Sequence, residues 1–139
     1  MVITQGGEVS HAGNENLTLP AAPSTPRAAR HFLVDTLRRR QVRSGVVDVA
    51  TLLTSELVTN AVRHGRGPVT VSVRTDPPSV RVVVHDDNPA MPVLGAGDDP
   101  AAEGGRGLRL VELLATRWGA DAHPPGGKDV WFELDLGEG

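Results

Sequence analysis

Residues 69–86, VTVSVRTDPPSVRVVVHD, decide the fold because they predict two strands joined by a turn. Valine occupies every second position from 69 to 73 and again from 80 to 84, and mostly polar side chains stand between them. The stretch Asp76-Pro77-Pro78-Ser79 is typical of a turn. Alternation of this kind indicates strands with one buried face and one face toward water. We therefore expect helices against one face of the sheet only.

The flanking segments supply the remaining elements. Alternation at 130–136 predicts a further strand, and Leu17-Thr18-Leu19-Pro20 predicts a short edge strand that Pro20 ends. Apolar residues at three- and four-residue spacing predict helices over about 24–39, 48–64 (with Asp48 as N-cap) and 108–118. The predicted fold class is α+β: a two-layer α/β sandwich whose mixed, mostly antiparallel sheet is covered on one face by helices.

Length and composition narrow the class of protein. The 139 residues suit one domain, and the absence of cysteine excludes disulfides, thiolate metal sites and a cysteine nucleophile. A net charge of −3 argues against a dedicated nucleic-acid binder. We find neither a signal-peptide pattern nor an apolar run of membrane length, so a cytoplasmic protein without membrane contact is expected. Residues 1–16 are polar and glycine-rich and predict a disordered tail before a domain at 17–139.

Three polar side chains recur at four-residue spacing on the helix predicted at 48–64. Glu56, Asn60 and His64 therefore share one helix face. An asparagine oxygen can ligate Mg²⁺, and a glutamate beside it can accept a proton from an attacking hydroxyl. The alternative is a polar stripe facing solvent, and His64 can simply pack at the helix end.

A glycine-rich stretch opens the last predicted helix. Gly104-Gly105-Arg106-Gly107-Leu108 would let the backbone approach an anion at a helix N-terminus. The sequence has neither the Walker nor the Rossmann glycine pattern. The alternative is a flexible start to the helix. The preceding segment, 87–106, has few apolar anchors, which is typical of a mobile lid, a binding loop or a disordered stretch.

Asp86 is the third candidate. It has the same parity as Val80, Val82 and Val84, so its carboxylate is expected at the edge of the core. A buried carboxylate needs a donor, and the exocyclic amine of a purine would serve. The alternative is an Asx-type turn at the strand end.

Taken in order, these stretches resemble the motifs of the histidine-kinase-like (GHKL, Bergerat-fold) ATPase superfamily. Residues 56–65, ELVTNAVRHG, resemble its N box; Asp86 falls where the aspartate of its G1 box stands; and Gly105-Arg106-Gly107-Leu108 resembles its G2 box. The resemblance covers about residues 17–136. The phrases LVELLATRWG and VWFEL are similar to the stand-alone bacterial anti-sigma-factor serine kinases (RsbW-like) in particular.

The resemblance implies an ATP and Mg²⁺ site. Asn60 would be the Mg²⁺ ligand, and Asp86 would accept a hydrogen bond from the adenine amine. The backbone at Gly105, Arg106, Gly107 and Leu108 would hold the phosphates, with Arg106 helping to neutralise them. Glu56 would be the general base toward a serine hydroxyl on a partner protein.

The resemblance also implies partners: a sigma factor, and an anti-anti-sigma factor that the protein phosphorylates. Direct nucleic-acid contact is not expected, and a homodimer stays open. One alternative is a catalytically inactive module of the same fold that sequesters a regulator. It is motivated by residues 86–90, DDNPA, which lack the glycines of the G1 box, and by Asp129, which stands where a threonine is expected. A carboxylate there is expected to weaken ATP binding. The other alternative is an ATPase domain serving other proteins in trans.

Overall fold

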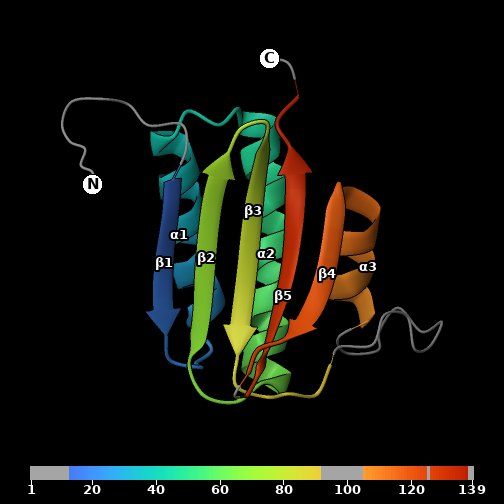
Figure 1. Cartoon of the computed structure of the whole chain (residues 1–139). Helices are drawn as coiled ribbons and strands as arrows, with labels where there is room; N and C mark the ends of the chain where they lie inside the picture. Colours follow the sequence, from blue (N-terminus) through green and yellow to red (C-terminus); the bar gives the residue numbers. More distant parts are fainter. Residues whose placement is uncertain (1–12, 92–104, 125, 138–139) are drawn as a thin grey trace.

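The computed structural model describes residues 13–91, 105–124 and 126–137. In these ranges the element order is β1 (Gly13–Leu19), α1 (Thr25–Arg39), α2 (Ser44–His64), β2 (Val69–Asp76), β3 (Ser79–Asp86), α3 (Gly105–Leu114), β4 (Arg117–Ala122) and β5 (Lys128–Asp135). The strands form one sheet in the order β1-β2-β3-β5-β4, and each neighbouring pair is antiparallel. The predicted α+β class is confirmed (Figure 1).

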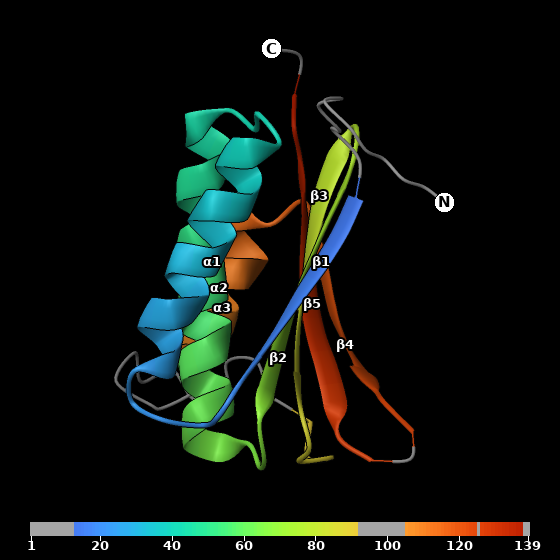
Figure 2. The same cartoon turned by 90° about the vertical axis from the view of Figure 1, so that its left-hand side faces the viewer.

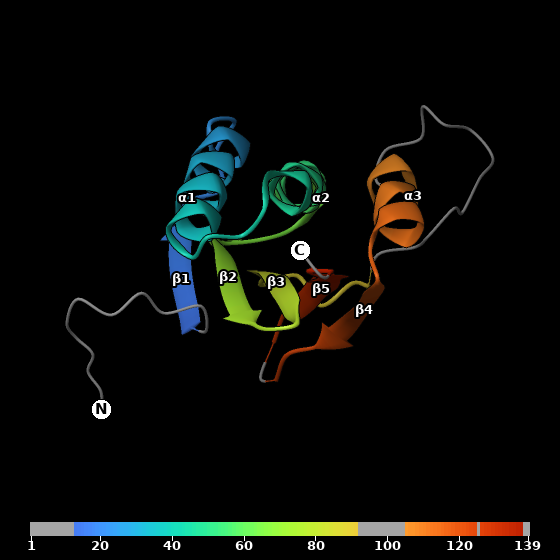
Figure 3. The ribbon, with the colours of Figure 1, turned by 90° about the horizontal axis from the view of Figure 1, so that it is seen from above.

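The helices lie on one side of the sheet. Figure 2 shows them as a separate layer beside the strands, and Figure 3 shows α1, α2 and α3 side by side above the sheet. The opposite face carries no helix among the described residues. This is the two-layer arrangement that the alternating valines predict. We call the side toward the helices the covered face and the other side the open face.

The core fills the space between these layers. All six alternating valines of β2 and β3 are at most 2% exposed. From β5 come Val130, Phe132 and Leu134, and from α2 eight buried residues that include Leu53, Leu57 and Val58. By length and composition α2 could cross a membrane. Its apolar character is explained here by burial, because its position between sheet and neighbouring helices requires apolar side chains on several sides.

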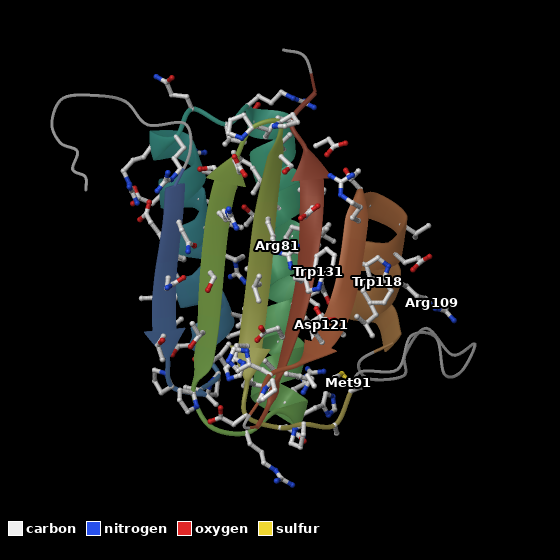
Figure 4. The ribbon with its side chains drawn as sticks, viewed as in Figure 1. Arg81, Met91, Arg109, Trp118, Asp121 and Trp131 are labelled. Atoms are coloured by element: carbon white, nitrogen blue, oxygen red, sulfur yellow. The ribbon has the colours of Figure 1, made fainter. Side chains whose placement is uncertain are left out.

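The open face is polar and holds an aromatic side chain at its centre. The guanidinium of Arg81 lies 4.0 Å from the ring centroid of Trp131, and the Trp131 Nε1–H donates to Asp121 at 2.9 Å. Figure 4 shows these three side chains together on β3, β5 and β4. Strand alternation thus gives the two faces different chemistry.

β1 begins at Gly13, so the prediction of a disordered tail through residue 16 is wrong for residues 13–16. They pair with β2, and Glu15 accepts hydrogen bonds from Arg39 at 3.0 Å and Arg40 at 2.7 Å. The charged partners lie at the C-terminal end of α1, where Arg39 is the last helical residue and Arg40 follows it, so nothing in the local sequence indicated order. Residues 1–12 lie outside the described residues.

Two further elements differ from the sequence analysis. α2 begins at Ser44 rather than at Asp48, and its extra turn is held by burial of Val46 and Val47. β4, Arg117–Ala122, was missed altogether, because its sequence RWGADA contains glycine, alanine and aspartate, which favour strands poorly. Pairing with β5 holds this edge strand instead, together with the Arg117–Glu133 ion pair at 2.6 Å.

Candidate functional site

Three elements meet at one corner of the covered face: the C-terminal end of α2, the end of β3 and the start of β5. The Asn88 side-chain amide donates to the carbonyl of His64 at 2.7 Å and so satisfies one of the last carbonyls of α2. Gly65 ends the helix directly against Asp86, where an added Cβ would lie 2.7 Å from the Asp86 Cγ. The glycine therefore permits a close approach that other residues would block.

Asp86 is buried at this corner, as its parity predicts, with 3% of its surface exposed. Its Oδ1 accepts the backbone N–H of Asn88 at 2.8 Å, so the Asx-type turn of the sequence analysis is present as well. The ammonium of Lys128 lies 3.1 Å from each carboxylate oxygen. The carboxylate therefore already has a cationic donor from the chain itself.

Sequence reasoning missed Lys128, the single lysine of the chain. It is 7% exposed and stands directly opposite Asp86 in the β3–β5 pairing. It also donates to the carbonyl of Asn88 at 3.0 Å, which leaves its charge well enclosed. Lys128 has the same parity as the buried Val130, Phe132 and Leu134, and this pattern could have predicted that its side chain points inward. A charge in such surroundings persists because it is paired and hydrogen-bonded.

Asp129 lies on the other side of the sheet from Asp86, so the expectation that its carboxylate weakens ATP binding is wrong for a nucleotide at the Asp86 corner. Its Oδ1 contacts the Nδ1 of His85 at 2.8 Å, and its Oδ2 contacts the Nδ1 of His123 at 3.0 Å. Successive residues of a strand point to opposite faces, so Lys128 points inward and Asp129 outward. The main electrostatic objection to a nucleotide on the covered face is therefore removed.

The predicted polar stripe is present on α2. Glu56 and Asn60 are half-buried and His64 is exposed. Within the described residues, the side chains of Glu56 and Asn60 make no hydrogen bond or ion pair. The stripe runs toward the corner, because His64 is the last residue of α2 and Asn60 lies one turn before it. An unpaired carboxamide and carboxylate on a helix that ends against a buried aspartate are suited to a polar ligand.

α3 begins at Gly105, as the glycine-rich motif predicts. Gly105, Arg106 and Gly107 form its first turn, whose backbone N–H groups have no partner within the helix. Leu108 is 1% exposed and packs in the core, so only its backbone is available to a ligand. Most of the predicted lid, residues 92–104, lies outside the described residues.

Comparisons with known proteins identify the family and the fold. The family model described as "Histidine kinase-like ATPase domain" matches residues 19–134, from the end of β1 to β5. The crystal structure of the RsbU and RsbW domains of Rv1364c from Mycobacterium tuberculosis is similar, with a TM-score of 0.66 and 22% identity. The likeness covers 89% of this chain but 32% of that one, about a third of its length. No curated protein sequence matches.

At this identity the structural likeness establishes the shared fold. The family match extends over both the α2 stripe and the Asp86 corner, and over nearly all of the chain that the structure describes. The chain therefore belongs to the histidine kinase-like ATPase family.

Proposed function

We propose that this protein binds Mg²⁺-ATP between the corner of α2, β3 and β5 and the first turn of α3, and transfers the γ-phosphoryl group to a serine or threonine of a partner protein. Family membership supports an ATP-binding regulatory protein. The observation that carries the proposal is the buried Asp86 carboxylate, which stands at the end of the polar stripe on α2.

The carboxylate of Asp86 retains acceptor capacity for a purine amine. An ionised carboxylate has about four acceptor positions, and its Oδ1 takes two of its three described contacts. Oδ2, which contacts Lys128, is therefore the natural acceptor for the adenine amine. Guanine would present a carbonyl to the same carboxylate and leave it without that donor, so ATP would be preferred over GTP.

The other predicted residues would bind the metal ion and the phosphates and would accept the proton. Asn60 would hold Mg²⁺ through its side-chain oxygen, and the first turn of α3 would hold phosphate oxygens through backbone N–H groups. The bound metal would supply charge neutralisation at the phosphates. Glu56 would take the proton from the substrate hydroxyl as that oxygen bonds to the γ-phosphorus and ADP departs.

The proposed partners are a sigma factor and an anti-anti-sigma factor, the latter being the phosphorylated one. Support comes from the RsbW-like phrases LVELLATRWG and VWFEL. The RsbU and RsbW domains in the similar structure agree with a partner-switching system. Sigma factors act on transcription, so we infer a cytoplasmic protein.

The second candidate is a binding module of the same fold that catalyses nothing. The Asp86–Lys128 pair favours it, because the corner is electrostatically complete without a nucleotide. The absence of the G1-box glycines from residues 86–90 also favours the binding module.

The deciding experiment begins with calorimetric titration of the full chain with ATP, with and without Mg²⁺, and with GTP as control. We expect saturable, Mg²⁺-dependent binding of ATP, weakened for GTP and abolished by Asn60→Ala. Absence of binding at millimolar ATP would overturn the proposal and favour the binding module.

Catalysis is tested with γ-labelled ATP and an extract of the source organism. Glu56→Gln is expected to keep ATP binding and to lose phosphoserine or phosphothreonine formation that depends on the added protein. Undiminished labelling by Glu56→Gln would remove the general-base role, and ATP binding without any labelling by the unmodified protein would favour the module.

A further inference from the structure

Two histidines and an aspartate converge on the open face, outside the proposed nucleotide site. They are His85 on β3, His123 directly after β4, and Asp129 on β5. One nitrogen of each ring and one oxygen of the carboxylate all lie within 4.8 Å of one another. Asp129 stands between the rings, with contacts of 2.8 Å to His85 Nδ1 and 3.0 Å to His123 Nδ1.

The backbone holds these three side chains in place. His85 and Asp129 are direct partners in the β3–β5 pairing. The His123 N–H donates to the carbonyl of Gly127 at 3.1 Å, which closes the turn between β4 and β5. The two ring centroids are 4.5 Å apart and the rings are inclined at 57°. The rings are thus brought together by strand pairing and a closed hairpin.

Asp87 gives the cluster an outer support. Its Oδ1 lies 3.2 Å from the Nε2 of His85, the nitrogen on the far side of the ring from Asp129. A cation that replaced the proton between His85 Nδ1 and Asp129 would leave the ring proton on Nε2, where Asp87 accepts it, and the Nδ1 lone pair would point at the cation. A carboxylate behind a histidine in this manner is the usual support of a metal-binding imidazole.

The donor set selects the class of cation. Two imidazole nitrogens and a carboxylate oxygen suit Zn²⁺ and similar transition metals, whereas Mg²⁺ and Ca²⁺ prefer oxygen ligands. Zinc ligands at the usual bond lengths stand about 3.4 Å apart in a tetrahedral site. The three ligand atoms lie within 4.8 Å of one another, with spacings of 2.8 and 3.0 Å from the two Asp129 oxygens to the rings, so side-chain rotations can bring them to this distance.

The three ligand side chains are accessible to solvent. His85 and Asp129 are about one-quarter exposed, and His123 is half exposed. An ion can thus enter from the solvent and keep a water as its fourth ligand. The neighbouring carboxylate of Asp121 accepts a hydrogen bond from Trp131 instead, so it is not counted among the ligands.

We propose that His85, His123 and Asp129 bind one Zn²⁺ ion on the open face, with Asp87 positioning His85. The site lies across the sheet from the proposed nucleotide corner and does not depend on it.

The test is a titration of the chelator-treated full chain with ZnCl₂ against a chromophoric zinc indicator, in the absence of nucleotide. We expect one equivalent of Zn²⁺ to bind, and binding to fall at least tenfold in His123→Ala and in Asp129→Asn. His31→Ala, which changes an exposed histidine on α1, is the matched control and should bind as the unmodified chain does.

Cobalt provides a second readout that reports the ligands directly. Co²⁺ added to the unmodified chain should give the visible absorption of a tetrahedral site, and His123→Ala should lose it while remaining folded by circular dichroism. Unchanged zinc binding in both His123→Ala and Asp129→Asn, or less than one equivalent in the unmodified chain, would overturn the proposal. ATP binding enters neither measurement, so failure here leaves the proposed function untouched.

Discussion

Two neighbouring cross-strand pairs, Asp86–Lys128 and His85–Asp129, join the same two strands but lie on opposite faces of the sheet. Each combines a carboxylate with a nitrogen base. In the first pair the side chains are 4% and 9% exposed, and in the second 21% and 26%. The difference teaches that burial sets the role of such a pair: the enclosed pair keeps its own cation and contributes mainly to stability, whereas the open pair can exchange its partner for a ligand from solution.

The largest effect is expected from breaking the enclosed pair. Lys128→Met leaves the Asp86 carboxylate buried without its cation, so the free energy of unfolding should fall by about 3–5 kcal/mol. Urea unfolding measures this change. Arg74→Met is the control: its ion pair with Asp76 spans 3.9 Å on exposed side chains, and its loss should cost less than about 1 kcal/mol.

The double variant Asp86→Asn/Lys128→Met sharpens the test, because it removes both charges. It should recover much of the stability that Lys128→Met loses. A single variant as stable as the Arg74→Met control would mean that water reaches Asp86 and that the corner is not sealed.

Gly65→Ala tests how closely the end of α2 approaches Asp86. The new methyl group would lie 2.4 Å from the carbonyl oxygen of Ala61 and 2.7 Å from the Asp86 Cγ, so the helix end must shift. We expect a loss of about 1–3 kcal/mol in unfolding free energy. Gly126→Ala, where an added Cβ meets nothing within 4 Å, should be nearly neutral. Equal stability of the two variants would contradict the close approach.

Breaking the open pair should cost much less. Asp129→Asn removes a partly exposed carboxylate whose partners can turn to water, so we expect less than about 1 kcal/mol in the metal-free protein. The measurement is urea unfolding with a chelator present. A loss as large as that of Lys128→Met would abolish the contrast between the two faces.

The smallest effect is expected at acid pH on the same open face. Hydrogen bonds from Arg117 and then Arg81 hold the pKa of Glu133 below its ordinary value of 4.5. A carboxyl group whose pKa is lower in the folded protein than in the unfolded chain stabilises the fold at pH values above its unfolded pKa. This stabilisation is lost as the pH falls through the folded pKa. Unfolding free energy measured from pH 6 to pH 3 should therefore fall less steeply in Glu133→Gln; an identical slope would contradict these contacts.

Much of the fold and part of the candidate site could be predicted from the sequence, because they follow from local periodicity. The alternating valines revealed the strands, the covered face and the burial of Asp86. β4 could not be predicted in this way, because its pairing with β5 rather than its own residues holds it. The order of residues 13–16 could not be predicted for a related reason, since the ion partners of Glu15 lie at the C-terminal end of α1.

The candidate site shows the same limit. The partner of Asp86 depends on how β3 aligns with β5, two strands separated by a helix and another strand, so Lys128 could not be assigned from local pattern. The error at Asp129 had a different origin. Motif alignment located the residue along the chain, whereas its alternation with the buried Lys128 and Val130 on either side would have assigned it to the open face.

The alignment of β3 with β5 also has a consequence for misfolding. A slip of β5 by one residue would bring Asp129 opposite Asp86 in the sealed corner, two carboxylates without a cation between them, and would move Lys128 out among the histidines. The same slip would turn every side chain of β5 to the opposite face, burying Glu133 and exposing Phe132. The two polar pairs and the alternating apolar residues of β5 therefore select the same register and together exclude this incorrectly assembled sheet.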